Sequence, residues 1–262
     1  MNKKGSLVNV GLGMTLGSHL TPLSRNFIEK ADVVFVAASD SLIEEWVKTM
    51  NPDVRSLQGY YQQGISRMVT YRNVIKAIMR EVRAGKQVCG AFYGHPGVFS
   101  WAPHELIKLA KQEGFRAHMQ PGISAEDCLY ADLAIDPGKT GCAHFEATQF
   151  MCNKRQYDTS AYLVLWQISI AGDQSLTKFS TDSHHRQLLV NLLLESYSKN
   201  HQVILYECAV LPIDRPRIEK IALYELATKQ VSLKTTLIIP PENDRIANNK
   251  ILKQLGEIKS LC

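Results

Sequence analysis

Two glycine-containing segments follow short apolar runs and could hold a ligand through their backbone. The first is Tyr93–Phe99 (YGHPGVF), after the apolar run 87–92, and the second is Pro121–Ala125 (PGISA), after 115–119. Glycine and proline give such segments a fixed, irregular path that leaves N–H and C=O groups open to contact. In α/β sheets, ligands bind outside the carboxyl ends of the strands. Either loop alone could be a plain connection, but two at one sheet edge predict a binding site.

A third segment, Gly11–Gly13 (GLG), follows the apolar run Leu7–Val10. The dinucleotide-binding fingerprint needs a further glycine at position 16, which is Leu16 here, and Gly17 stands one place late. The segment therefore indicates only a tight turn or a close approach of the backbone to another group.

Strand and helix patterns alternate between these loops. Thr21 suits a helix N-cap with Pro22 in the first turn, and Ser124 can cap a helix that begins at Ala125. This alternation predicts a parallel sheet with helices on both faces. The expected strands are 7–10, 32–38, 87–92 and 115–119, and the expected helices are 21–30, 40–50, 70–84 and 103–114.

The second half of the chain is richer in strands than in helices. Its patterns predict strands over 142–148, 161–168, 202–207, 218–222 and 235–240, with one helix over 184–198. Such a ratio favours a mixed or antiparallel sheet. The sequence thus predicts two unlike α/β domains, at 1–122 and 123–245, followed by a tail (246–262) that contains one amphipathic helix.

Composition excludes several classes of protein. The net charge of +5 comes from 30 basic and 25 acidic residues that are spread along the chain, so we expect no nucleic-acid partner. No apolar run approaches the roughly 18–20 residues that cross a membrane, and the basic N-terminus lacks the apolar core of a signal peptide. We therefore expect a cytoplasmic protein that is not membrane-bound. The six cysteines include no C-x-x-C pair, so no metal site is expected.

In order and spacing, the GLG, YGHPGVF and PGISA loops and the final apolar run TTLIIP (235–240) resemble the tetrapyrrole methylase superfamily. Within it, the chain most resembles borosin-type peptide backbone N-methyltransferases. The closer resemblance rests on RMVTY (67–71), YGHPGVFSW, PGISAEDCLYADLAIDPG, FEATQFM, LWQISIAG and YECAVLP. It implies that S-adenosylmethionine binds between two unlike α/β domains and leaves as S-adenosylhomocysteine, and that the protein is a homodimer.

The resemblance also implies the residues that contact the cofactor. Cys208 is an adjacent alternative to Ala209 among them. The implied contacts are Tyr93, His95, Val98 and Phe99 in the first loop, Ser124 and Ala125 in the second, and Gln167, Ala209, Thr235 and Thr236 in the second half.

The family's catalytic arginine and tyrosine correspond to Arg67 and Tyr71, and a further tyrosine corresponds to Tyr61, with Tyr60 one residue away. Taken by themselves, Arg67 and Tyr71 could be a surface pair one helical turn apart. Methylation of an amide nitrogen, however, requires the amide to be pushed toward an imidate. A guanidinium can stabilise the charge on its oxygen, and a tyrosine whose pKa an arginine lowers can act as the base.

The resemblance implies a peptide substrate. Fungal members carry it as a C-terminal extension, whereas the tail Lys250–Cys262 is short and charged, so we expect action in trans on a separate precursor peptide. Two alternatives stay open: a precorrin C-methyltransferase of the same fold, and a catalytically silent peptide-binding protein.

Overall fold

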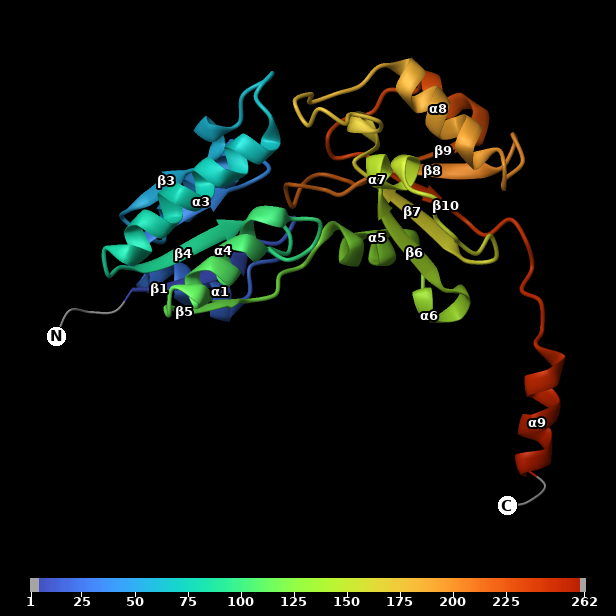
Figure 1. The fold of residues 1–262 in the computed structure, drawn as a ribbon, viewed down its shortest axis with the longest axis horizontal. Helices are drawn as coiled ribbons and strands as arrows, with labels where there is room; N and C mark the ends of the chain where they lie inside the picture. The colour runs from blue at the N-terminus through green and yellow to red at the C-terminus, as the bar shows by residue number, and fades with distance from the viewer. Residues whose placement is uncertain (1–4, 260–262) are drawn as a thin grey trace.

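The computed structural model describes residues 5–259, which form two five-stranded sheets, one in each half of the chain (Figure 1). The expectations for the extreme N-terminus and for Cys262 concern residues outside this range. The expected fold class, with a parallel sheet followed by a mixed one, is confirmed.

All pairings in the first sheet are parallel, in the order β3-β2-β4-β1-β5. Its strands are β1 (Ser6–Gly11), β2 (Val33–Ala37), β3 (Val54–Ser56), β4 (Gln87–Phe92) and β5 (Arg116–Met119). The helices that follow them are α1 (Pro22–Lys30), α2 (Ser41–Lys48), the 3-10 turn η1 (Gln58–Tyr60), α3 (Arg67–Arg83) and α4 (Trp101–Gln112).

The central strands of this sheet, β1, β2 and β4, are buried on both faces. Along β2, Val33 and Phe35 pack with α3 and α4, whereas Val34 and Val36 pack with α1 and α2. Since successive strand residues point to opposite faces, a run that is apolar throughout needs a helical layer on each side. The expected two-sided cover is therefore present, and all carboxyl ends of the strands lie at one edge.

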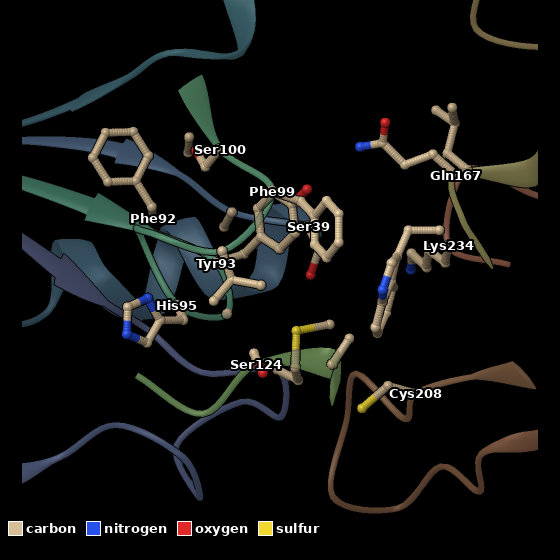
Figure 2. A pocket seen from close by; sticks show the side chains of 18 of the residues that line it. Ser39, Phe92, Tyr93, His95, Phe99, Ser100, Ser124, Gln167, Cys208 and Lys234 are labelled. Atoms are coloured by element: carbon tan, nitrogen blue, oxygen red, sulfur yellow. The ribbon is translucent and has the colours of Figure 1, made fainter. Parts of the chain in front are cut away.

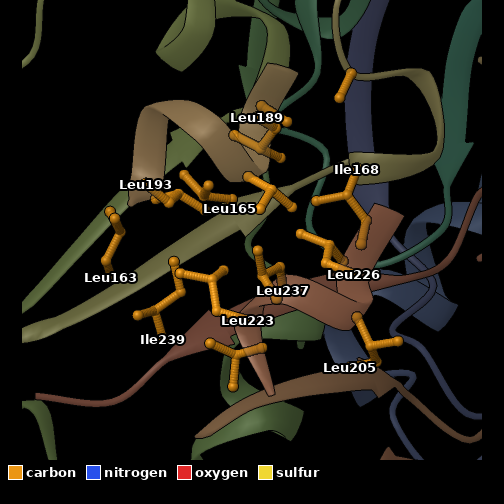
Figure 3. Close-up of a cluster of buried hydrophobic side chains, with 14 of the residues drawn as sticks. Leu163, Leu165, Ile168, Leu189, Leu193, Leu205, Leu223, Leu226, Leu237 and Ile239 are labelled. Atoms are coloured by element: carbon orange, nitrogen blue, oxygen red, sulfur yellow. The ribbon is translucent and has the colours of Figure 1, made fainter. Parts of the chain in front are cut away.

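The second sheet has the order β6-β7-β10-β8-β9, and only β6 and β7 run parallel. One face packs on α8 and η3 in the largest apolar cluster (Figure 3), and the other packs on α5. Its elements are α5 (Ala125–Leu133), α6 (Pro137–Thr140), β6 (Cys142–Glu146), α7 (Ala147–Cys152), β7 (Tyr162–Trp166), η2 (Ile168–Ile170), α8 (Ser183–Leu193), β8 (Gln202–Glu207), β9 (Arg217–Ala222), η3 (Leu223–Thr228) and β10 (Thr236–Ile239).

Several boundaries differ from the sequence prediction. Helix α3 starts at Arg67 rather than at 70, and α8 ends at Leu193 rather than at 198. The strand expected over 142–148 stops at Glu146, whose carboxylate caps α7 by accepting from the amide of Gln149. The short β3 and α6 were not expected. The capping hydrogen bond of Glu146 starts a helix at Ala147, although the apolar pattern of the sequence continues past this point.

The described tail ends in α9 (Asn249–Lys259), which lies apart from both sheets in Figure 1. The chain passes from the first sheet to the second between β5 and α5, near the domain boundary expected at 122/123, which stays a prediction.

Candidate functional site

A cavity of about 430 Å³ lies where the carboxyl edge of the first sheet faces the second half of the chain. Figure 2 shows side chains from both halves around this space, among them Tyr93 and Phe99 from one half and Gln167 and Lys234 from the other. Clefts of this size between two sheets are typical of small-molecule sites. Of the thirteen residues expected at the site, all line this cavity except Ala209.

The loop after β4 is held by its own histidine. The amide of Gly97 donates to Nδ1 of His95 at 2.9 Å, so the proton of this imidazole lies on Nε2. The carbonyl of Gly97 is 2.9 Å from Nε2 of His104. Phe99 takes a left-handed conformation (φ 47°), which is unfavourable for a residue with a side chain. The surrounding contacts therefore fix a strained backbone that faces the cavity.

Three glycines, one from each loop, bring the loops together. A Cβ on Gly11 would lie 2.4 Å from the carbonyl oxygen of Gly94 and 2.6 Å from Cα of Gly122. The N-terminal GLG segment is therefore a close-approach element, as its sequence suggested. It packs the β4 and β5 loops side by side, and this places Tyr93 and Ser124 on one cavity.

Ser124 also caps α5, as expected. Its hydroxyl donates to the carboxylate of Asp127 at 2.7 Å, and the amide of Asp127 donates back to it. Ala125, the first residue of α5, lines the cavity beside it. The start of α5 therefore lies at the cavity wall.

The second half contributes backbone and side chains from three segments. Gln167 follows β7 in a left-handed conformation (φ 59°), and Thr235 donates from its hydroxyl to Glu207. Thr236 begins β10 and lines the same wall. At the third segment, Cys208 lines the cavity, and the carbonyl of Ala209 instead accepts from Thr15 at 3.0 Å. Cys208 thus lines the cavity and Ala209 does not, and the cofactor contact at this segment stays a prediction.

Tyr61, Arg67 and Tyr71 line the same cavity. The ring of Tyr71 stacks on Trp101 at 6.1 Å and meets the ring of Tyr61 edge-on at 6.4 Å. Tyr60 is absent from the cavity lining of the described chain and packs in the core beneath α3. Because α3 begins at Arg67, both Arg67 and Tyr71 lie in its first turns, on the side that faces the cavity.

The titration of these tyrosines is set mainly by burial. Burial raises the pKa of Tyr71, and the nearby charge of Arg67 offsets only part of that effect. Burial and the neighbouring Tyr71 likewise raise the pKa of Tyr61. Tyr61 is 36% exposed and lines the cavity. The charge of Arg67 therefore acts on the pKa of Tyr71 in the expected direction, but desolvation of the phenolate is the larger effect and the net shift is upward.

Sequence reasoning missed several residues of the lining. Ser39 and Gln58 follow the ends of β2 and β3, and Phe179 precedes α8. Ser39 and Gln58 stand after strands of the same sheet, so their position at its carboxyl edge was a usable signal. Glu126, Trp166 and Lys234 also line the cavity, and nothing local marked them.

Among residues 5–259, no group of three metal-ligand side chains is arranged to hold an ion. Within the same range, no helix has the length and apolar character to cross a membrane.

A parallel sheet joined to a mixed sheet, with glycine-containing loops around a cavity, defines an α/β protein with two unlike sheets. The family described as Tetrapyrrole (Corrin/Porphyrin) Methylases matches residues 6–222, and the chain belongs to this family. Two solved structures share the fold: a cobalt precorrin-4 methyltransferase (TM-score 0.64, 16% identity, 90% of this chain and 94% of that one) and a uroporphyrin-III-C-methyltransferase from Thermus thermophilus (TM-score 0.61, 19% identity, 91% and 93%).

Curated relatives are more similar in sequence. The methyltransferase and lentinulin A precursor of Lentinula edodes is 37% identical over 259 residues, which are 97% of this chain and 62% of that protein. The corresponding omphalotin A precursor of Omphalotus olearius is 36% identical over 257 residues, again 97% and 62%. The names of both describe a methyltransferase and a ribosomally synthesised cyclic peptide precursor. The chain thus spans about 62% of the length of these relatives.

Proposed function

We propose that this protein is an S-adenosylmethionine-dependent methyltransferase that N-methylates backbone amides of a separate precursor peptide. The observation that carries the proposal is that Arg67, Tyr71 and Tyr61 open into the same cavity as the glycine loops. A methyl donor held by the loops and an amide held by the arginine and tyrosines would therefore share one enclosed space. The names of the relatives, which join a methyltransferase to a peptide precursor, support the same assignment.

The lining suits the cofactor. The close packing of Gly11, Gly94 and Gly122 brings the three loops together, and Gly94 itself lies on the cavity wall. Tyr93 and Phe99 offer aromatic surface, and Ser124 and Ala125 offer a helix start. These residues, with Gln167, Cys208, Thr235 and Thr236, would hold the cofactor. When bound, it supplies an electrophilic methyl group on a sulfonium.

Arg67, Tyr71 and Tyr61 would prepare the peptide amide for methylation. Tyr71, as the phenolate, accepts the amide proton, and Arg67 stabilises the negative charge that moves to the amide oxygen. S-adenosylmethionine held beside the amide would supply the methyl group to its nitrogen and would leave as a neutral thioether. The proton on Tyr71 returns to solvent. The stacked ring of Trp101 fixes Tyr71 while this occurs.

The described tail lies apart from the body of the protein. Helix α9 lies apart from both sheets in Figure 1, and its apolar residues, such as Leu252 and Leu255, are exposed. It supplies nothing to the cavity of its own chain within residues 5–259.

The test is co-expression with each short peptide encoded beside this gene, followed by mass spectrometry. The expected result is a ladder of single-methyl increments, with fragment spectra that place each methyl on a backbone nitrogen. Arg67→Lys is the control and should shorten the ladder, because lysine lacks the planar guanidinium fork. Methylation of a corrin precursor with every peptide unmodified would overturn the proposal. A failure to bind S-adenosylmethionine in calorimetry would instead favour a silent peptide-binding protein.

A further inference from the structure

A loop from the second half of the chain holds the start of α3. The amide of Arg67 donates to the carbonyl of Leu176 at 2.8 Å, and the amide of Gly64 donates to the carbonyl of Thr177 at 3.2 Å. The guanidinium of Arg67 donates through Nη1 to the carbonyl of Lys178 at 3.0 Å. In Figure 1 the segment before α8 extends toward the start of α3. The segment 173–178 is called the α3 clamp below.

The clamp replaces a missing helix cap. Ser66 occupies the N-cap position of α3, but its side chain makes no capping hydrogen bond. The first amides of a helix have no partner within the helix and need one from elsewhere. The carbonyl of Leu176 supplies one of them. Leu176 adopts a left-handed conformation (φ 58°), which costs an L-residue about 1–2 kcal/mol, so the clamp must be held by other contacts.

Asp173 provides those contacts. Its Oδ1 accepts from the amide of Ser175 at 3.0 Å and from the hydroxyl of Ser175 at 2.5 Å, and its Oδ2 accepts from the amide of Lys178 at 3.1 Å. Oδ2 is also 3.9 Å from Nη2 of Arg67. Asp173 is only 4% exposed, and a buried carboxylate is unfavourable unless donors and a cation surround it.

We propose that Asp173 is a positioning residue for methyl transfer. It closes the turn 173–178 so that the carbonyls of this turn fix Arg67, and through the first turn of α3 also Tyr71, against the cavity. The inference rests on the proposed function for its catalytic consequence, although its structural part is independent of the substrate. Asp173 lies outside the cavity lining among the described residues and acts through Arg67.

The first test needs no substrate. Asp173→Asn places an amide N–H₂ opposite the amide of Lys178 or the guanidinium of Arg67, so donors face donors. Hydrogen–deuterium exchange should then accelerate in 173–178 and also in 64–71. The matched control is Asp158→Asn: Asp158 accepts from the amide of Ser160 at 2.8 Å in a turn before β7, away from the cavity, and its loss should leave both segments as in the wild type. Faster exchange confined to 173–178 would overturn the proposal.

The second test uses the peptide methylated in the co-expression experiment. Asp173→Asn should lower kcat by about 10–10²-fold, as expected for misplaced catalytic groups, with KM for the peptide and cofactor affinity near wild type. Added to Arg67→Lys, it should cause no further loss, because both changes act through one guanidinium. If the fold losses in kcat of the two single variants multiply in the double variant, the inference is contradicted. If Arg67→Lys alone methylates at full rate, the proposed role of Arg67 fails, while the exchange result still decides whether the clamp exists.

Asp173→Asn could destabilise the fold, so Ser175→Ala provides a milder change. It removes the Ser175 hydroxyl, which donates to Asp173 and also contacts the hydroxyl and amide of Thr177, and it leaves the bond from the Ser175 amide to Asp173 in place. It should accelerate exchange in the same two segments to a smaller extent. If Ser175→Ala folds and exchanges faster in 173–178 but at the wild-type rate in 64–71, the result counts against the clamp.

Discussion

Substitution of Tyr71 by Phe separates chemistry from binding at this site. The phenylalanine keeps the ring that stacks on Trp101 at 6.1 Å and meets Tyr61 at 6.4 Å. Within residues 5–259 the hydroxyl of Tyr71 has no hydrogen-bond partner, so its removal leaves no buried group unsatisfied. We therefore expect the free energy of unfolding to change by less than about 1 kcal/mol. Cofactor affinity should also stay at the wild-type level.

The rate should fall steeply. Loss of a general base costs about 10²–10⁴-fold, which corresponds to about 2.7–5.5 kcal/mol in the transition state. The loss should be in kcat, because the hydroxyl acts only once the amide is bound. The assay is the rate of single-methyl increments in the peptide, followed by mass spectrometry under saturating cofactor, with calorimetry of the cofactor as the binding control.

The pH dependence gives an independent check. Burial raises the pKa of Tyr71 from its usual value of 10.0, and Arg67 opposes this only in part. Below that pKa the reactive phenolate increases about tenfold for each pH unit, so kcat should rise with pH from about 7 to 9. In Tyr71→Phe this dependence should disappear. A wild-type kcat that is independent of pH over this range would refute the phenolate role. A Tyr71→Phe enzyme of full activity would make Tyr61 the candidate base.

Three further changes test the rest of the site and assembly. Gly97→Val should abolish binding of S-adenosylmethionine in calorimetry with little change in circular dichroism, because a Cβ there would lie 2.9 Å from Sδ of Met119 and 3.2 Å from Cε1 of His95; unchanged affinity would contradict the loop assignment. Gly122→Ala should weaken cofactor binding and lower the melting temperature, because its Cβ would lie 2.4 Å from the carbonyl oxygen of Gly94. If affinity and melting temperature both stay at the wild-type values, the loops need no close approach. Light scattering at micromolar concentration should give the mass of a homodimer, and a monomer mass would exclude one.

Most strands and the loops that line the cavity could be predicted because their signals are local. Val33–Ala37 is apolar at every position, and only a strand covered on both faces buries such a run. Thr21 and Ser124 cap their helices as their residue types favour. The prediction failed where a local signal was absent or ambiguous. The start of α3 at Arg67 is an example, because the partner of its first amide is Leu176, far away in the chain.

The sequence by itself determined the fold class, the order of the elements and the loops that form the cavity, since apolar periodicity and glycine positions act over a few residues. The tertiary structure alone decided which groups meet and what that does to them. It placed Cys208 rather than Ala209 on the cavity, and it placed Asp173 beside Arg67. It also decided the titration of Tyr71, because the balance between desolvation and the charge of Arg67 depends on how many atoms of distant segments surround the phenol.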